Sequence, residues 1–512
     1  MKAYKNRGKG GTIGARASFV CFVITLLITV GAAKADTITV GPGPGYDFNN
    51  IQAAIDDAND GDEVVVADGT YTGPGNRNID FLGKDIIVRS ENGAVNCIID
   101  VEASQRGKYL GFLLRKGEKK TSVIQGFTIT GGFMPNGGGI SCRGSSPTIK
   151  NCIITKNISG HGGGIALEES EALVIDCLIT GNEGWDVGGG IYCGRDSSPV
   201  ITNCNITANK SYGGGGIYCY SSSPKLINCT IGDNTAYLGG GICCEHSNLT
   251  INNCTITNNS AYYGGGTYYR GSGEHTLSNC ILYYNKSPEE PQIYLWEGSL
   301  VSIEYSNIQG GYQGLGNIDK DPCFIEPGYW ADANDPNIIV EPNDPNAVWL
   351  EGDYHLLPAS PCIDTGDPNY ISEPNETDLD GNPRISGPRI DMGAYESNYI
   401  EAEINFTPKT INCNSRGNWV KAHITLPDGF LPEDVDVNTP AWAEPLGVQS
   451  EYIKLLGSNP VKLEIAFDRR AFCDAITEPG ELEMTILGSL TTGQTFYATD
   501  TIRVINKSDK RN

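Results

Sequence analysis

The sequence predicts an all-β protein in which a parallel β-helix, a solenoid of short strands, is followed by a C-terminal β-sandwich. A block of about 25 residues repeats six times between Asn136 and Asn285, and apolar and polar residues alternate inside each block. Residues 401–512 instead hold longer alternating runs that are separated by turns. A regular period of this size with no helical spacing inside it is typical of a solenoid.

Residues 1–35 have the composition of a secretory signal peptide. A basic start precedes an apolar run from about Ala17 to Val30, and the small residues of Ala33-Lys34-Ala35 predict cleavage after Ala35. No other stretch approaches the length of a membrane span, so no transmembrane segment is expected after cleavage. The sequence therefore predicts a protein that is secreted or held at a bacterial cell surface.

The chain without this leader is strongly acidic. The whole sequence holds 37 Lys+Arg and 61 Asp+Glu, and removal of the leader takes away six basic residues and no acidic ones, which leaves a formal charge of −30. Such a surface would repel nucleic acid and anionic membranes, so neither is an expected partner. Ca²⁺ or a neutral to cationic glycan surface fits this charge better, so a polysaccharide or cell-surface glycan is the expected partner.

Residues 36–121 are expected to form an N-terminal cap and the first turns of the β-helix. Ile51, Ala54 and Ile55 recur at helical spacing, and the helix that they predict would cover the open end of the coil. Two apolar runs, at residues 62–71 and 85–88, predict the first strands.

Residues 122–310 carry the regular repeats, and one copy shows their register. Ile191 and Cys193 lie two positions apart, as do Cys204 and Ile206, and Ile201 stands between these pairs. Side chains two apart share one face of a strand. These residues are therefore expected to point inward from three short strands in every turn.

Ten thiols fall into two inward columns. One column holds Cys142, Cys193, Cys219 and Cys244, and the other holds Cys152, Cys177, Cys204, Cys229, Cys254 and Cys280. A metal cluster would use paired C-x-x-C spacing or histidines, which these columns lack, whereas small polarizable thiols fit a narrow apolar interior. We therefore expect buried thiols, with inter-turn disulfides as an alternative in an oxidising compartment.

A polar residue precedes each cysteine of the second column, where the chain turns between sheets. These corner residues are Asn151, Asp176, Asn203, Asn228, Asn253 and Asn279. Asparagine tolerates the left-handed backbone conformation, and its amide can bond to the amides in adjacent turns. Glycine triplets such as residues 188–190 predict a second corner.

The first strands resemble a known family. The run Ile51-Gln52-Ala53-Ala54-Ile55, followed by residues 61–66 and by Gly69-Thr70-Tyr71, is similar to the opening segment of secreted right-handed parallel β-helix proteins in the pectate-lyase-like superfamily. The repeats also resemble a class of bacterial surface β-helices. The resemblance covers about residues 40–400 and implies a right-handed coil. It implies no single activity, because the superfamily includes lyases, glycosidases, epimerases, adhesins and phage tailspikes.

Residues 311–400 leave the period and are rich in Pro, Asp and Asn, which predicts a cap that closes the C-terminal end of the coil. The segments Ser360 to Asp367, Asp378 to Arg384 and Asp391 to Glu396 resemble the choice-of-anchor Q segment of secreted bacterial proteins. This resemblance implies attachment to a surface and identifies no reaction.

Aspartates of the same cap form a candidate metal site. Asp378, Asp380 and Asn382 resemble the start of a calcium loop, and Asp364 and Asp367 are further candidate ligands. Ca²⁺ requires oxygen ligands on such a glycine-bearing turn, but the bidentate Glu at the twelfth position is missing. Asp-Gly turns also occur without metal. Both alternatives stay open, a calcium site at these four aspartates and an ordinary set of turns.

Residues 401–512 predict a β-sandwich module for attachment or binding, because their alternating runs have the length and spacing of its strands. Cys413 and Cys473 are expected to form a disulfide in this module. Cys323 and Cys362 are expected to bridge the preceding cap.

Catalysis by the coil would need acid and base groups that are gathered on its outer face. A uronan lyase uses a Lys or Arg base beside carboxylates that hold Ca²⁺, yet the outward columns of the repeats scatter their charges. His161 lies in a glycine corner that recurs in every repeat and is expected to be a loop residue. The alternative is a polysaccharide lyase or glycoside hydrolase with its acid and base at residues 106–120 or 168–171.

One aromatic residue per turn follows the closing asparagine of four repeats: Trp185, Tyr212, Tyr237 and Tyr262. Rings along a rod offer apolar faces with polar edges, which match sugar rings. The alternative is that the rings stack on one another and cover the corner. Together with the regular repeats, this column favours a non-catalytic glycan-binding or adhesion scaffold over an enzyme.

Overall fold

The structure is a computed structural model of the chain. It describes residues 35–505 except 105, 297, 341–345, 351 and 416. The predicted signal peptide at residues 1–35 therefore lies outside the described residues, apart from Ala35. Within the described ranges, no helix is long and apolar enough to cross a membrane.

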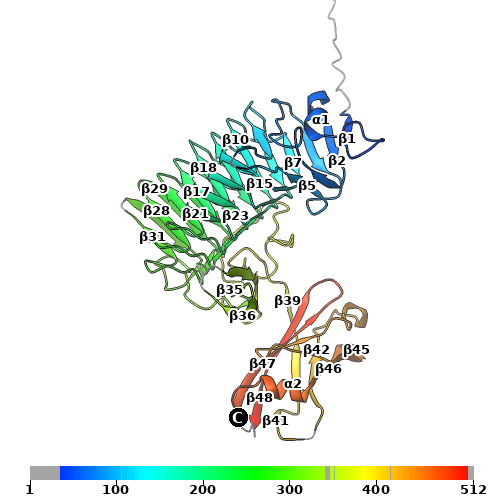
Figure 1. Cartoon of the computed structure of the whole chain (residues 1–512). Coiled ribbons are helices and arrows are strands. Elements are labelled where there is room, and N and C mark those ends of the chain that lie inside the picture. Colours follow the sequence, from blue (N-terminus) through cyan, green and yellow to red (C-terminus); the bar gives the residue numbers. More distant parts are fainter. Residues whose placement is uncertain are drawn as a thin grey trace, which may run out of the picture.

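Three long parallel sheets run along the coil (Figure 1). An eleven-stranded sheet extends from β1 (Thr37–Val40) to β32 (Ser299–Glu304), a ten-stranded sheet from β3 (Gly69–Tyr71) to β33 (Asn307–Ile308), and an eight-stranded sheet from β6 (Phe112–Leu114) to β31 (Ile293–Leu295). Each strand pairs with its equivalent in the next turn, about 4.8 Å away. This arrangement confirms the predicted parallel β-helix.

One turn shows how the sequence fills the interior. Strands β18 (Ile191–Gly194), β19 (Val200–Thr202) and β20 (Asn205–Thr207) each belong to a different long sheet. Their inward side chains, Ile191, Cys193, Ile201, Cys204 and Ile206, are all 0% exposed and belong to one continuous core. The predicted inward register is confirmed, and burial of each isoleucine contributes about 1.5 to 3 kcal/mol.

A fourth, short strand follows the ten-stranded sheet in four turns, so the expectation of three strands per turn was wrong there. These strands are β9 (Phe133–Asn136), β13 (Ile158–His161), β17 (Glu183–Val187) and β21 (Lys210–Gly213). Parallel bridges continue the sheet from Lys210 through Thr235 and Ser260 to Lys286. Residues of this fourth row, such as Val187 and Leu238, pack over the outward tyrosines of the eight-stranded sheet.

The column thiols are buried and free, so the structure places them as packing groups without inter-turn disulfides. The disulfide between Cys413 and Cys473 is formed as predicted. The predicted bridge between Cys323 and Cys362 was wrong, since both thiols are free. The amide of Asn307 donates to the Cys362 sulfur at 3.1 Å instead.

Cys204 and Cys229 should resist a bulky thiol reagent until the protein is denatured, because both side chains are 0% exposed. Cys204→Ser should lower the free energy of unfolding by about 1 to 3 kcal/mol, because a hydroxyl group then replaces a thiol in an apolar interior. Mass spectrometry of labelled peptides measures the protection, with the half-buried Cys323 as an internal reference. Rapid labelling of both buried thiols would contradict the inward register.

The predicted corner residues adopt the left-handed conformation, with φ of 51° to 54° from Asn151 to Asn279. Near the end of the column their amides are linked, since Asn279 donates to Asn253 and Asn253 donates to Asn228, each at 3.1 Å. A more complete ladder runs through the asparagines that close each repeat: Asn157, Asn182, Asn209, Asn234, Asn259 and Asn285. Each of the first five donates its side-chain amide to the next oxygen at 2.9 to 3.1 Å.

Helix α1 (Ile51–Asp57) covers the N-terminal end of the coil, as predicted (Figure 1). The Asn50 side chain caps its first turn by accepting from the backbone N–H of Ala53. The Lys84 ammonium donates to the carbonyl oxygens of Ile55 and Ala58 at the other end, where helix carbonyls lack partners. Ile51 and Ile55 are buried against the first strands.

The cap lies along the side of the coil, which differs from the predicted closure of its end. Its strands β34 (Phe324–Glu326) and β38 (Asp353–Leu356) pair with each other. The backbone N–H of Gly393 donates to the Asn279 carbonyl, and that of Ala394 donates to the Thr255 hydroxyl. These acceptors lie on the side of the coil that the ten-stranded sheet forms. At the end of the coil, Ile318 instead forms a parallel bridge with Asn307 of the last strand, β33.

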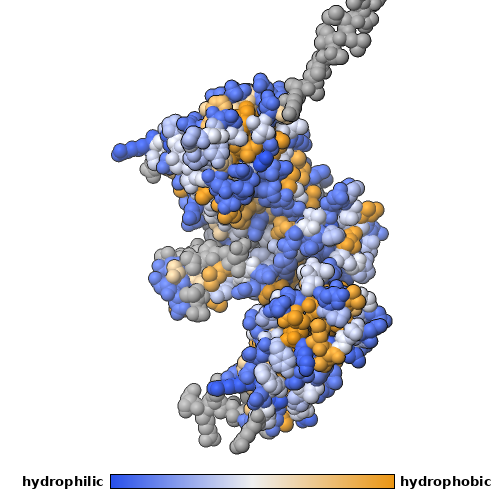
Figure 2. Space-filling model, turned by 90° about the vertical axis from the view of Figure 1, so that its right-hand side faces the viewer, coloured by the Kyte–Doolittle hydropathy of each residue, from blue (hydrophilic) through white to orange (hydrophobic). Residues whose placement is uncertain are grey.

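The C-terminal residues form two packed antiparallel-rich sheets, which agrees with the predicted β-sandwich. A four-stranded sheet contains β40 (Glu403–Thr407), β42 (Trp419–Thr425), β46 (Val461–Asp468) and β45 (Tyr452–Ser458) in that order. The other sheet is centred on β47 (Gly480–Ser489) and β48 (Thr495–Ile505). Buried phenylalanines fill the space between the sheets. Figure 2 shows apolar residues gathered on one face of this lobe.

His275 lies inside the coil, on β29 (Gly273–Ser278), where the neighbouring turn has Leu249. Burial lowers the pKa of His275 from 6.5 to about 4. As the pH falls, His275 therefore becomes protonated near pH 6.5 in the unfolded chain but only near pH 4 in the folded protein. This stabilisation is complete above pH 6.5 and is lost as the pH falls toward 4, by up to about 3 kcal/mol.

His275→Leu should therefore flatten the loss of stability between pH 7 and pH 4.5. Urea unfolding of both proteins at the two pH values measures this, because the carboxylates that also titrate are common to both. An unchanged pH dependence would show that His275 is accessible to protons in the folded protein.

Candidate functional site

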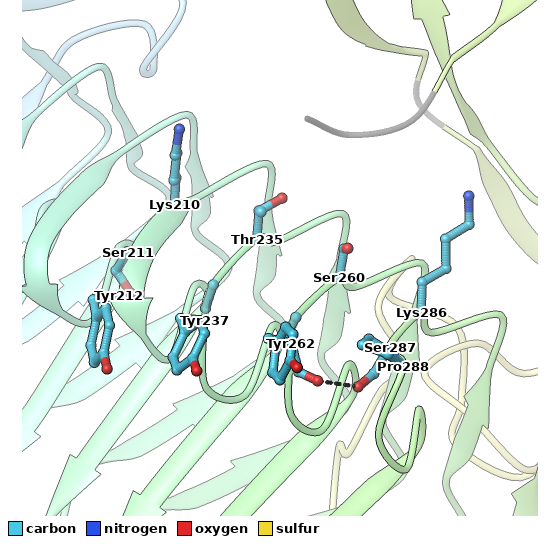
Figure 3. A pocket seen from close by; sticks show the side chains of 12 residues that line it. Lys210, Ser211, Tyr212, Thr235, Tyr237, Ser260, Tyr262, Lys286, Ser287 and Pro288 are labelled. Carbon is cyan, nitrogen blue, oxygen red and sulfur yellow. Dashed lines mark hydrogen bonds between the residues drawn. The ribbon is translucent and has the colours of Figure 1, made fainter. Parts of the chain in front are cut away.

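An open groove of about 720 Å³ runs along the outer side of the fourth row of strands. Lys210 and Tyr212 lie two apart on β21 and share its outer face. The bridged register repeats this pair once per turn, which gives one wall of Lys210, Thr235, Ser260 and Lys286 and another of Tyr212, Tyr237, Tyr262 and Pro288. Figure 3 shows the three tyrosines in line, with the lysines at the two ends of the opposite wall.

The three tyrosines of this groove stack on one another and remain exposed. The centroid of Tyr237 lies 5.2 Å from that of Tyr212 and 5.3 Å from that of Tyr262, with interplanar angles of 18° and 16°. Their exposed fractions are 55%, 41% and 48% from Tyr212 to Tyr262. The two alternatives from the sequence therefore combine, because the ring faces meet each other and the ring edges and hydroxyls meet the solvent.

Trp185 is separate from this groove, although the sequence placed it in the same column. Its ring packs edge-on against Phe133, two turns away, at 4.9 Å, and it does not line the groove. The cause is the longer repeat at this point, which forms an irregularity in β17 between Gly184 and Val187. Trp185 is 51% exposed, so it extends the aromatic surface toward the N-terminal end.

The groove offers positive charges, hydroxyl groups and aromatic rings, and it lacks the carboxylate pair of a glycoside hydrolase. Its lining residues are lysines, tyrosines, small hydroxyl residues, alanines and one proline, and no carboxylate is among them. Ser287 donates its hydroxyl to the Tyr262 carbonyl at 2.8 Å, which fixes the last turn of the wall. Glycoside hydrolysis uses a pair of carboxylates, so hydrolysis does not fit this groove.

The two irregular turns that were candidates for catalysis lie side by side in the structure. Lys120 contacts Glu171 at 3.7 Å, and Glu168 lies between Arg143 at 3.6 Å and Arg195 at 3.4 Å. The repeat pattern did not predict this grouping, because the residue in register with Glu168 in the next turn is Gly194. Arg195 is one position later, and its left-handed backbone, with φ of 54°, lets its side chain reach Glu168.

His161 is the last residue of strand β13 in the fourth row, so it lies at the end of a strand and not in the loop that was expected. Its ring stacks on Tyr192 with centroids 5.2 Å apart, and its Nδ1 lies 3.0 Å from the Asn136 side-chain oxygen. Asp186 lies 3.9 Å from its other ring nitrogen. These contacts give His161 a structural position, at the end of the stack that Tyr192 and Tyr218 form on the outer face of the eight-stranded sheet.

Of the four aspartates of the calcium hypothesis, Asp364, Asp367 and Asp378 accept hydrogen bonds from backbone N–H groups, and Asp380 contacts a histidine. Asp378 is 0% exposed and accepts from the backbone N–H groups of Asp380, Asn382 and Glu396. Within the described ranges, no group of three or more His, Cys, Asp or Glu side chains has the geometry of a metal site. Asp364 and Asp367 accept from the backbone of Arg389 and Asn369. Calcium binding here stays an untested prediction.

Asp380 instead faces a histidine. The His355 ring lies between Asp353 and Asp380, with 2.5 Å from its Nδ1 and its Nε2 to the respective carboxylates. Burial acts to lower the pKa of His355, but the two carboxylates outweigh it and raise that pKa to about 10. A charged imidazolium therefore joins β38 to the loop at Asp380, in the place where the sequence suggested a cation.

Comparison with known proteins supports the coil. The family described as right handed beta helix region matches residues 96–245. No curated protein matches the chain. Among solved structures, pectate lyase Pel9A is 16% identical with a TM-score of 0.41, over 71% of this chain and 96% of that one. An alginate lyase from Paenibacillus sp. str. FPU-7 is 15% identical with a TM-score of 0.30, over 52% and 99% of the two chains. No activity follows from similarities of this size.

Proposed function

We propose that this chain is an exported, non-catalytic β-helix protein that binds a polysaccharide along the tyrosine groove, at a bacterial cell surface or in the surrounding medium. The observation that carries the proposal is the row of three aligned tyrosines, whose hydroxyls and ring edges face an open groove that holds no carboxylate. The predicted leader and the resemblance of the cap to an anchor segment support export.

A polymer fits this groove better than a small molecule, because the groove repeats. Three of its four turns present a tyrosine on one wall, and all four present a lysine, threonine or serine on the other, about 4.8 Å from the next. A chain of sugar units can meet the same hydroxyl contacts in successive turns, and each contact adds to the effective affinity of the next. We expect weak binding of short oligosaccharides and stronger binding as the chain lengthens.

Affinity electrophoresis of the purified protein against a panel of neutral and acidic polysaccharides tests this function. At least one polysaccharide should retard the protein, and its oligosaccharides should compete in order of length. The same mixtures, with and without Ca²⁺, are assayed for reducing ends and unsaturated uronates. Product formation would assign a hydrolase or lyase instead, and no retardation by any polymer of the panel would sink the proposal.

A further inference from the structure

A second group of charged residues lies outside the groove, on the outer edge of the eight-stranded sheet. Arg143 ends β10 (Ile140–Arg143) and Glu168 ends β14 (Ile165–Glu168), and these two residues are paired in register. Arg195 follows β18. Arg115 follows Leu114, which is paired with Cys142, so Arg115 comes beside Arg143. Three arginines and Glu168 thus come from four successive turns, and the exposed Glu169 and Asp196 follow Glu168 and Arg195 directly in the chain.

Glu168 holds two of these arginines in place. Its side chain is 6% exposed, and its two oxygens lie 3.6 Å from Nε of Arg143 and 3.4 Å from Nε of Arg195. The arginine side chains remain 60% and 51% exposed. Each contact uses Nε, so it leaves the Nη groups of both guanidinium groups for a ligand, and such a fork matches the two oxygens of a carboxylate or sulfate.

Tyr192 completes the floor of this group. Its phenol lies over Gly194, where a Cβ atom would be 2.3 Å from the hydroxyl oxygen, so a larger residue there would displace the ring. Burial raises the pKa of Tyr192, and Glu168 and Arg195 act on the same hydroxyl. The hydroxyl is therefore protonated at neutral pH, which makes it a donor beside the two guanidinium groups.

Arg115 adds a positive charge that the protein does not neutralise. Within the described ranges it makes no ion pair, and its side chain is exposed. Like charges at neighbouring positions of a sheet are unfavourable. An anion between Arg115 and Arg143 would remove this repulsion.

We propose that Arg115, Arg143 and Arg195, arranged around Glu168, form a binding site for an oxyanion, either free or carried as the carboxylate or sulfate group of a sugar. The site lies on a different sheet from the tyrosine groove and does not depend on the function proposed for that groove.

Isothermal titration of the whole mature protein with sodium sulfate, glucuronic acid, glucose 6-sulfate and glucose tests this site. The oxyanions should bind and glucose should not, and binding should weaken as NaCl is raised, because salt screens exposed charges. In the variant R115Q/R143Q, affinity should fall by about tenfold or more, which is the effect of losing charge-assisted hydrogen bonds. Glu168 keeps Arg195 in this variant, so the fold is expected to persist.

R270Q is the matched control. Arg270 lies on the same edge, is 53% exposed and contacts Glu245 at 3.9 Å, so its loss should leave oxyanion binding unchanged. Binding of sulfate alone assigns a site for free anions, and binding of the acidic sugars assigns the anionic group of a glycan. The site is refuted if none of the oxyanions binds, or if R115Q/R143Q binds them as tightly as the unchanged protein with the same melting temperature.

Discussion

Asn234→Leu should lower the free energy of unfolding by about 3 to 5 kcal/mol, the largest effect that we expect from a single uncharged residue. The Asn234 side chain is 0% exposed, donates to the Ile206 carbonyl and to Asn259, and accepts from the backbone and side chain of Asn209. Leucine has a similar volume but no polar atoms. Its presence would leave a buried N–H and a buried carbonyl without partners, at about 1 to 3 kcal/mol each.

Urea unfolding monitored by circular dichroism measures this loss. Asn203→Gly is the control, because Asn203 is a corner residue at φ of 51°, a conformation that glycine adopts freely. The control should cost less than about 1 kcal/mol. Equal costs for the two variants would mean that the corners, and not the buried amide ladder, hold successive turns together.

Arg384→Met should cost about 3 to 5 kcal/mol of cap stability at pH 8 and above, where it leaves the ionised, buried Glu396 carboxylate without its cation. Arg384 and Glu396 are both fully buried and lie 3.4 Å apart, and Arg384 also donates to the Gly393 carbonyl at 2.7 Å. Burial and the neighbouring Asp391 raise the pKa of Glu396 to about 8, while Arg384 acts to lower it. Without Arg384, we expect this pKa to rise further.

The sign of the pH effect follows from that change. Glu396 can be buried as the neutral acid below its folded pKa, so the cap of Arg384→Met should be protected at pH 5 and opened at pH 8. Limited proteolysis within residues 360–396 at the two pH values measures this. The second change Glu396→Gln should restore part of the protection at pH 8. Equal cleavage of variant and unchanged protein at pH 8 would contradict the role of this ion pair.

The coil was predictable because its rules are local. The alternation of Ile191, Cys193 and Ile201 fixes which side chains enter the core, and this pattern is independent of other parts of the chain. The fourth row escaped prediction, since Lys210 to Gly213 shows no apolar alternation and pairs only because adjacent turns already lie in register. The amide ladder left a signal in the sequence, the asparagine that closes each repeat, but the pattern alone does not tell a buried amide from an exposed one.

The candidate sites depend on contacts that a linear pattern does not contain. The period predicts that Tyr212, Tyr237 and Tyr262 align, but one longer repeat removes Trp185 from the groove. Charge spacing suggested calcium at Asp380, where the fold brings His355 from 25 residues away. Glu168 and Arg195 meet because the turn after Gly194 is left-handed. In each case a long-range contact decides the chemistry of the side chain.

The most direct test of the account is polysaccharide binding by the triple variant Tyr212→Phe/Tyr237→Phe/Tyr262→Phe. The change keeps the stacked rings, which contribute about 0.5 to 1.5 kcal/mol per pair, and removes only the row of hydroxyls that faces the groove. We expect the affinity for the retarding polysaccharide to fall severalfold while the melting temperature stays the same. Unchanged affinity, or a loss of affinity that only follows a fall in melting temperature, would contradict the assignment of the groove as the glycan-binding site.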